Sequence, residues 1–317
     1  MLRGRHFPID RPVLPAVRVG GVDARVVMAA PGRMGLLVPA GLARGRHAVS
    51  VEGVGGEVFL DLGTPVATGL HQVDNPAFDA QGALYVTHSG RRGQQVPVSV
   101  FRVAGVAEER EPYLSGIVNA TSLAFNANGV LHVSSRFEGQ VYRVKRDLSL
   151  ETVATELGVA FGIAFGSDGT MFVGDRSGTV FRIGTSGRPI PFVTLPPSMA
   201  AFHLAMGPDD ELFVTAPTFD TYDRVYRIDR QGVVGVVSTE FGRPQGLACD
   251  ASGTLYVVDA IAGGAGLYLV RPGEPRELVL AAQALVGVAF DPRGGLVVAS
   301  NDTAYRLDVD LRPWRFP

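Results

Sequence analysis

The most regular feature of the sequence is a hydrophobic–polar pattern that occurs six times between positions 75 and 301. In each copy a short apolar run is followed by a turn, which in most copies ends in glycine, and then by an alternating run; one copy reads GIAFGSDGTMFVGDR. Glycine supplies the positive φ of such turns, and alternation is typical of a half-buried β-strand. Each copy therefore predicts a β-hairpin. The copies begin, about 42 residues apart, at Asn75, Ser122, Gly162, His203, Gly246 and Gly287.

Two further strands are predicted after most copies, because short alternating runs follow each hairpin. Four strands repeated every 40–50 residues or so are typical of the blades of a β-propeller. No copy contains a long glycine-free stretch of helical period, which disfavours a helical repeat. The sequence thus predicts an all-β chain with a six-bladed β-propeller at residues 63–317. Clear third strands are predicted at 141–144, 180–183 and 225–228, and fourth strands at 151–154, 190–194 and 233–237.

The two ends of the predicted propeller are expected to meet in one blade. The segment 64–70 precedes the first copy, at the place of a fourth strand, and we predict that it pairs with 304–307 in the last blade. Residues 310–317, which include Trp314, are the alternative occupant of that place or a cap on the blade.

The first 62 residues follow a different pattern. Alternating segments at 16–20, 24–28, 34–39 and 47–52 predict four strands of a small β-sandwich, forming a domain at residues 1–62. The motifs LRGRHF, PAVRVGG, VPAG and HAVSV resemble those of TIG/IPT immunoglobulin-like domains. Such domains begin with one more strand and a proline–glycine turn, so we expect a chain that is truncated or starts late. An open sheet edge favours pairing with another chain, which predicts self-association through this sandwich.

Composition narrows the class of protein. With 40 glycines, 21 prolines and 19% charged residues, the chain is turn-rich and globular. The formal net charge of -2 argues against nucleic-acid binding, no apolar run is long enough for a membrane span, and the single cysteine, Cys249, excludes an internal disulfide. The opening MLRGRHFPID lacks the apolar region of a signal peptide. This predicts a cytoplasmic protein, or a secreted or periplasmic one if the native chain begins upstream.

Candidate chemistry is expected where the innermost strands begin, because six strands crowd the channel there and glycine is the usual residue. His203 stands where three other copies have glycine. It is a candidate general base or metal ligand, or else a lining residue bonded to water or to a carbonyl group. Asp74 is a candidate base or cation ligand, or else a loop cap. The other polar residues predicted at the channel are Asn75, Asn119, Thr121, Ser122 and Gln245.

The loop after the second strand of each blade opens at the same mouth of the channel, where a ligand is expected. Arg136 and Arg176 occupy equivalent positions in adjacent blades and can clamp a carboxylate or phosphate. The alternative is a local ion pair with Glu138 or Asp175. Tyr222, in a longer loop, can form a pocket wall. Further polar residues near the mouth are His71, His88, Arg91, Arg92, Asp220, Asp223, Asp259, Asn301 and Asp302.

The propeller repeats resemble the regucalcin/gluconolactonase-like and NHL-repeat families, most clearly in PQGLACDASGTLYVVDA. Lactone hydrolases of this kind hold a divalent cation with a Glu, two Asn and an Asp. A hard cation prefers several oxygen ligands, and phenylalanine offers none. The resemblance therefore implies that the usual metal site is lost; a rearranged Ca²⁺ or other divalent-cation site at Asp74, Asn119 and His203 is the alternative. The family's four ligand positions fall here on Asp74, Thr121, Phe161 and either Gln245 or Phe202.

Two functions are compatible with these patterns. The first is a ligand- or partner-binding propeller that takes a small molecule or a protein at the channel mouth. The second is a lactonase- or esterase-like hydrolase of small organic substrates, in which Asp74 and His203 act at the same mouth. Neither a nucleic acid nor a membrane is expected as a partner.

Overall fold

The computed structural model describes residues 2–9, 13–56, 58–104, 109–309, 311 and 313. The chain forms two compact units, Met1–Thr64 and Pro65–Pro317. Within the described residues the regular structure is β, apart from the 3-10 helix η1 (Pro208–Asp210). No helix in this part of the chain has the length and apolar character needed to cross a membrane.

The first unit is a set of six strands in the order β1-β4-β3-β2-β5-β6. Strand β3 is shared by the two halves, since its first residues pair with β2 and its remaining residues pair with β4. The buried side chains of Phe7, Val17, Val19, Met34 and Val49 form its core. The strands are β1 (Leu2–Arg3), β2 (Val17–Val19), β3 (Val22–Ala30), β4 (Arg33–Leu37), β5 (Gly45–Val51) and β6 (Val58–Leu62).

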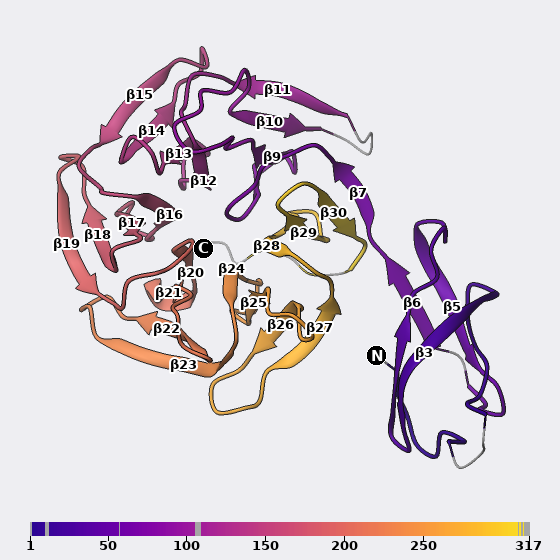
Figure 1. Ribbon diagram of the computed structural model, residues 1–317. Helices are drawn as coiled ribbons and strands as arrows, with labels where there is room; N and C mark the ends of the chain where they lie inside the picture. The colour runs from indigo at the N-terminus through magenta and orange to yellow at the C-terminus, as the bar shows by residue number, and fades with distance from the viewer. Residues whose placement is uncertain are drawn as a thin grey trace. The chain divides into compact units, whose positions relative to one another are not determined.

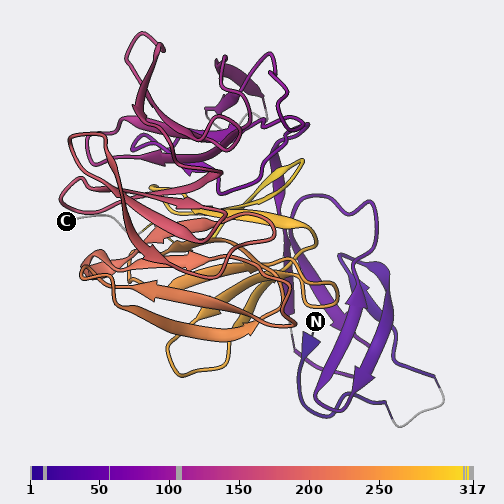
Figure 2. The same ribbon diagram turned by 60° about the vertical axis from the view of Figure 1, so that its left-hand side comes forward.

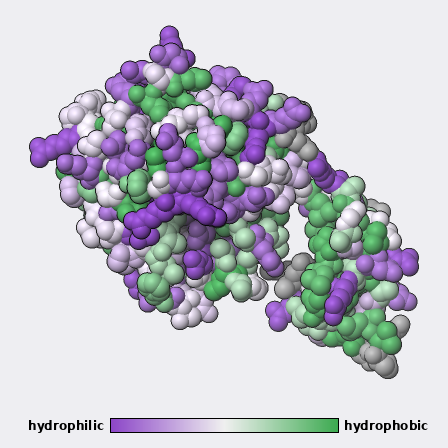
Figure 3. All heavy atoms as spheres, turned by 45° about the horizontal axis from the view of Figure 1, so that its top comes forward, coloured by the Kyte–Doolittle hydropathy of each residue, from purple (hydrophilic) through white to green (hydrophobic). Residues whose placement is uncertain are grey.

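Four of these strands, β2 to β5, lie where the sequence predicts strands, and β1 and β6 were not predicted. Many apolar side chains of this unit are exposed, including Val27, Leu37 and Phe59. Figure 3 shows hydrophobic residues, in green, over much of the visible face of the unit. The TIG/IPT resemblance and self-association through this unit remain predictions.

The second unit contains six four-stranded sheets within the described residues. Five of them use four strands that are consecutive in the chain. The sixth combines three strands from the end of the chain with one strand that precedes all the others. The strands of the first three sheets are β8 (Ala77–Phe78), β9 (Leu84–Thr87), β10 (Val100–Val103) and β11 (Arg110–Leu114); β12 (Ala120–Phe125), β13 (Leu131–Ser135), β14 (Gln140–Val144) and β15 (Leu150–Ala154); and β16 (Ala160–Phe165), β17 (Met171–Asp175), β18 (Thr179–Ile183) and β19 (Pro189–Thr194).

The remaining sheets repeat this plan. Figure 1 shows the sheets following one another around a central axis, and Figure 2 shows the ring turned to the side, with loops on both faces. The arrangement is a β-propeller. The strands are β20 (His203–Met206), β21 (Leu212–Thr215), β22 (Asp223–Ile228) and β23 (Val234–Phe241); β24 (Pro244–Cys249), β25 (Leu255–Asp259), β26 (Gly266–Val270) and β27 (Glu277–Ala281); and β28 (Leu285–Phe290), β29 (Leu296–Ser300), β30 (Ala304–Leu307) and β7 (Thr64–Ala67).

Strand β7 closes the ring by lying next to β30, which confirms the predicted pairing of 64–70 with 304–307. The rival segment 310–317 is described only at Leu311 and Pro313, and Trp314 lies outside the described residues. Pro313 forms an isolated bridge with Asp250.

The crowded axis explains part of the high glycine content. Gly162 donates its N–H to the carbonyl group of Phe202 at 2.8 Å. A Cβ atom on this glycine would lie 2.6 Å from the amide nitrogen of Leu204, so a larger residue would force the innermost strands β16 and β20 apart. Other glycines serve the predicted turns: Gly129, for example, has φ of 71°.

The propeller has two faces. We call them the loop face, which carries the loops between the second and third strands of each sheet, and the turn face, which carries the turns between the first and second strands.

Candidate functional site

Asp74 and His203, the two residues predicted to be catalytic, meet at the centre of the propeller although 129 positions separate them. His203 is the first residue of β20, and its Nδ1 lies 2.6 Å from Oδ1 of Asp74, which precedes β8. Both residues are buried, with exposed fractions of 0% and 2%. The contact therefore joins the first and fourth repeats of the ring at a point that solvent does not reach.

The hydrogen bonds around Asp74 show which group is the donor. Asp74 Oδ1 also accepts the backbone N–H of Asn75 at 2.7 Å, so it acts as an acceptor and His203 Nδ1–H donates to it. The carboxylate thereby fixes both the tautomer and the orientation of the imidazole ring. It also caps the backbone of its own loop, which is the alternative role considered for Asp74.

Several polar atoms near these residues are buried without a partner in the described structure. They are His203 Nε2, Asp74 Oδ2, both side-chain heteroatoms of Gln72 and the hydroxyl oxygen of Ser89. Buried polar atoms usually bind protein groups or ordered water, because an unmet hydrogen bond is costly. The propeller centre is therefore expected to hold bound water.

The residues at the centre do not fit the cation site that the family resemblance implies. Phe161 and Phe202 are buried and carry no ligand atom. The hydroxyl group of Thr121 donates to the carbonyl group of Asn119 at 2.7 Å. Among the residues that the structure describes, no group of three or more His, Cys, Asp and Glu side chains is placed to hold a metal ion. The donor set is therefore unsuited to a hard divalent cation.

Asn75 and Gln245, predicted to bind ligand, contribute to the packing of the innermost strands. The Asn75 amide donates to the carbonyl group of Leu247 at 2.9 Å and accepts the N–H of Val288 at 2.9 Å, which links β24 to β28. The backbone carbonyl group of Gln245 accepts the hydroxyl hydrogen of Thr215 at 2.5 Å. These contacts fix the strands, and ligand binding by the two side chains remains a prediction.

Asn119 organises the loop between β9 and β10. This residue has φ of 52°, a left-handed conformation that asparagine tolerates. Its Oδ1 accepts the N–H of Gly93 at 2.7 Å, and its Nδ2 donates to the carbonyl groups of Ser89 at 2.6 Å and Arg91 at 2.8 Å. The amide thus bonds to the β9–β10 loop and holds the segment that carries Arg92, and the rearranged cation site of Asp74, Asn119 and His203 remains a prediction.

Replacing Asn119 with alanine is expected to lower the free energy of unfolding by about 2–3 kcal/mol, because its three hydrogen bonds to backbone groups, one buried and two partly buried, are lost. Urea denaturation of the wild type and the variant measures this change. Asn128→Ala is the matched control: Asn128 is an exposed turn residue, and its replacement should change stability by less than about 0.5 kcal/mol. Equal effects of the two substitutions would contradict the assigned role of Asn119.

Arg136, Arg176 and Arg92 form a cluster of positive charge on the loop face, which we call the arginine cluster. Arg136 directly follows β13, and Arg176 directly follows β17. Their backbone N–H groups donate to the backbone carbonyl groups of Asn119 and Val159, at 3.4 and 3.2 Å respectively. Burial lowers the pKa of Arg136, and the nearby charges of Arg176 and Arg92 lower it further. The sequence prediction that these two arginines occupy equivalent positions in adjacent blades is consistent with this geometry.

The alternative of a local ion pair for Arg136 or Arg176 is wrong within the described part of the chain. The carboxylate of Glu138 accepts the hydroxyl hydrogen of Tyr142 at 3.0 Å. The carboxylate of Asp175 accepts the N–H of Val159 at 2.8 Å and the hydroxyl hydrogen of Ser177. The carboxylates of Glu138 and Asp175 thus accept hydrogen bonds from other groups. Among the described residues, neither forms an ion pair with Arg136 or Arg176.

Histidine and aromatic side chains surround the arginine cluster. Burial lowers the pKa of His71, and the charges of Arg136 and His88 lower it further, so this imidazole is neutral near pH 7. Phe137 is 53% exposed, and its ring lies so close to Gly93 that a Cβ atom there would come within 3.1 Å. Tyr222 is exposed on the β21–β22 loop of the same face. The loop face therefore combines cationic and apolar surface.

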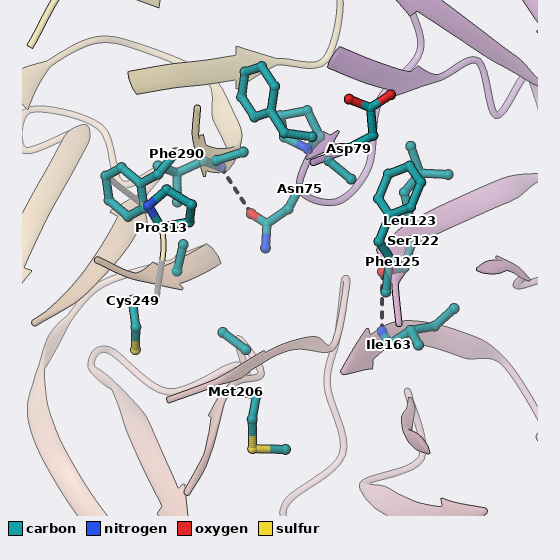
Figure 4. A pocket seen from close by; sticks show the side chains of 18 of the residues that line it. Asn75, Asp79, Ser122, Leu123, Phe125, Ile163, Met206, Cys249, Phe290 and Pro313 are labelled. Carbon is teal, nitrogen blue, oxygen red and sulfur yellow. Dashed lines mark hydrogen bonds between the residues drawn. The ribbon is translucent and has the colours of Figure 1, made fainter. Parts of the chain in front are cut away.

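A separate central cavity of about 570 Å³ opens toward the turn face. Figure 4 shows Asn75, Ser122, Met206 and Cys249, from four different blades, around it. Most of the lining residues are apolar. The cavity therefore lies on the far side of Asp74 and His203 from the arginine cluster, and two of the polar residues predicted at the channel, Asn75 and Ser122, line it.

Cys249, which lines this cavity, is expected to be unreactive. Burial raises the pKa of its thiol to about 12, with smaller contributions from Asp250 and Glu211. The thiolate is the reactive species, so labelling with 5,5′-dithiobis(2-nitrobenzoic acid) at pH 8 should be at least about 100-fold slower in the folded protein than in guanidinium chloride. Equal labelling rates in the folded and unfolded protein would show that the thiol is not buried and that its pKa is not raised.

No protein-family model matches the sequence, and no curated protein matches it. Solved structures do match: a candidate gluconolactonase has a TM-score of 0.64 at 16% identity, over 80% of this chain and 94% of its own. The shared fold is the β-propeller.

Two other similar structures extend the comparison. An auxiliary nutrient binding protein from Bacteroides thetaiotaomicron has a TM-score of 0.62 at 13% identity, over 92% of this chain and 90% of its own. A catalytically inactive virginiamycin B lyase from Staphylococcus aureus, with quinupristin, has a TM-score of 0.55 at 12% identity, over 76% of this chain and 96% of its own. The three proteins have different activities, so their likeness to this chain shows the fold alone.

Most of the polar residues at the centre were predicted from the sequence, but three features of the site were not. Phe137 was not predicted, because it lies in a loop and the alternating pattern identifies only strand residues. The buried, unpartnered side chains of Gln72 and Ser89 were not expected. The turn-face cavity was also missed, because the residues lining it look like ordinary strand residues in the sequence.

Proposed function

We propose that this chain is a six-bladed propeller that binds a small anionic organic molecule on its loop face. Arg136, Arg176 and Arg92 are the proposed charged contacts, and a carboxylate or phosphate is the proposed anionic group. The observation that carries the proposal is that Arg176 and Arg92 lie near Arg136, while no ion pair of these three side chains is found among the described residues.

Electrostatics favours an anion at this position. Like charges that are partly removed from water repel one another, and the lowered pKa of Arg136 records that repulsion together with its burial. Guanidinium groups form strong two-pronged hydrogen bonds with carboxylates and phosphates. A bound anion would replace the repulsion with attraction, which supports binding rather than a purely structural role for the cluster.

The surroundings of the cluster suggest a ligand that also has an apolar part. Phe137, which follows Arg136 in the chain, is exposed and lies beside Gly93, which follows Arg92. Exposed aromatic rings next to arginines contribute contact area with little loss of conformational freedom. An aromatic or branched aliphatic acid, or a phosphate monoester of similar size, therefore matches the surface better than a bare inorganic ion.

The burial of Asp74 and His203 supports binding over hydrolysis. A general base must come within hydrogen-bonding distance of its substrate, and these two side chains are 2% and 0% exposed. One similar structure, which spans 92% of this chain, is an auxiliary nutrient binding protein, and a binding role for this chain is in line with that likeness.

A thermal-shift screen tests this proposal. The panel contains aromatic and aliphatic carboxylates and phosphate monoesters at low salt, each paired with its neutral amide or alcohol. A true ligand at 100-fold its Kd adds about 2.7 kcal/mol of stability, so an anion should raise the melting temperature by several degrees while its neutral partner does not. Equal shifts from the neutral compounds, or no shift from any anion, would refute anion binding; turnover of a hit would favour the hydrolase.

A further inference from the structure

The turn-face cavity has the size of a small-molecule site and is separate from the arginine cluster. Its volume of about 570 Å³ lies within the range of about 300–1,000 Å³ that is typical of ligand pockets. Its walls come from the innermost strands of the ring, and apolar side chains such as Phe125, Leu204, Met206 and Phe290 predominate. We call Asn75, Asp74 and His203 the central layer: Asn75 lines the cavity, whereas Asp74 and His203, which are buried and bonded to each other at 2.6 Å, do not.

The inner end of the cavity offers hydrogen-bond donors that the protein does not use. Ser122 Oγ accepts the N–H of Ile163 at 3.2 Å, and no described group accepts the hydroxyl hydrogen of Ser122. Asn75 Nδ2 has two hydrogens, and one of them donates to the carbonyl group of Leu247. Both residues line the cavity, Ser122 from within β12 and Asn75 from just before β8 (Figure 4). Two free donors therefore lie at the closed end of an otherwise apolar space.

Charge at the cavity favours a neutral occupant. The one ionised side chain among the described lining residues is Asp79, at the outer turn. Its carboxylate already accepts the N–H groups of Gln81 and Ala83 at 3.0 and 2.8 Å and the hydroxyl hydrogen of Tyr85 at 3.1 Å. With no cationic partner inside and apolar walls, an anion would lose its hydration without compensation.

From these observations we infer that the turn-face cavity binds a neutral, mainly apolar molecule that carries one hydrogen-bond acceptor, such as a carbonyl group, at its buried end. The Ser122 hydroxyl and the second Asn75 amide hydrogen contact that acceptor. The apolar body contacts the side chains of the innermost strands. This site is independent of the anion site on the loop face, because the two lie on opposite sides of the central layer.

Fluorescence titration with Nile red, a neutral dye with a carbonyl group, tests the inference on the whole chain. The expected result is a saturable, blue-shifted increase with one dye bound per chain. Ala205→Leu and Ala248→Leu, which place extra bulk on two different lining strands, should each weaken binding about tenfold or more. Ser122→Ala removes a donor and should weaken binding about fivefold.

The control is Ala281→Leu, which adds the same bulk on the outermost strand β27, at an exposed position. It should leave dye binding unchanged, and a melting curve confirms that each variant is folded. If one leucine variant fails to fold, the other still decides. Absence of saturable binding in the wild type, or equal binding by Ala205→Leu, Ala248→Leu and Ala281→Leu, would overturn the inference.

Discussion

Replacing Asp74 with alanine is expected to lower the free energy of unfolding of the propeller by about 3–5 kcal/mol. Asp74 Oδ1 accepts hydrogen bonds from His203 Nδ1–H at 2.6 Å and from the N–H of Asn75 at 2.7 Å. Both donors would lose their protein partner at a buried site, and an unpartnered buried donor is costly. Urea denaturation followed by circular dichroism measures the change.

Two controls distinguish this effect from a general loss of charge. Asp74→Asn keeps an oxygen that can accept both hydrogen bonds, so its cost should be smaller, about 1–2 kcal/mol. Asp308→Ala removes an exposed carboxylate and should change stability by less than about 0.5 kcal/mol. A loss for Asp74→Ala as small as that for Asp308→Ala would show that the buried pair does not stabilise the ring.

This expectation differs from the one that follows from a catalytic role. If Asp74 and His203 were an exposed acid–base pair, their replacement would abolish turnover and leave the melting temperature nearly unchanged. The observed burial of both side chains indicates the opposite order of effects, with the largest consequence for folding. Measuring stability and screening for turnover in the same variants therefore separates the two roles.

The double substitution Arg136→Gln and Arg176→Gln is expected to weaken binding of the anion found by screening at least about 100-fold. Each guanidinium group contributes charge-assisted hydrogen bonds, and each such bond contributes about 1.5–3 kcal/mol. Isothermal titration calorimetry measures the affinity. Without ligand the double variant should be as stable as the wild type or slightly more stable, because the substitution removes the repulsion that Arg136 experiences.

Arg146→Gln is the matched control for that experiment. Arg146 is exposed and lies in the β14–β15 loop, on the turn face, so its replacement should change the affinity by less than about twofold. Similar losses in the Arg146 variant and the double variant would indicate a diffuse effect of net charge. A strong loss of stability in the double variant would instead indicate that the arginines have a structural partner.

The sequence predicted the propeller well because the information is local and repeated. Each turn with its glycine, such as the one at Gly129, specifies its own hairpin, and six similar hairpins specify the ring. The closure by β7 followed from the same periodicity. In the first unit, β6 was missed: Val58–Leu62 lies within the predicted domain at residues 1–62, but no strand was predicted there.

The details of the site depend on distances between repeats, which a single sequence does not contain. The contact of His203 with Asp74 joins the fourth repeat to the first and depends on how the strands are placed around the axis. The free arginines depend on loop geometry, since Glu138 and Asp175 were close enough in sequence to pair with them but bond elsewhere. Empty space such as the turn-face cavity arises only when all the innermost strands are assembled.

A crystal structure of the protein with the tightest anion from the screen tests the proposed function most directly. The expected result is a ligand on the loop face whose carboxylate or phosphate oxygens lie about 2.7–2.9 Å from the guanidinium nitrogens of Arg136 and Arg176, with its apolar part against Phe137. A ligand bound instead in the turn-face cavity or on the first unit, with the arginine cluster still free of any anion, would contradict the proposal.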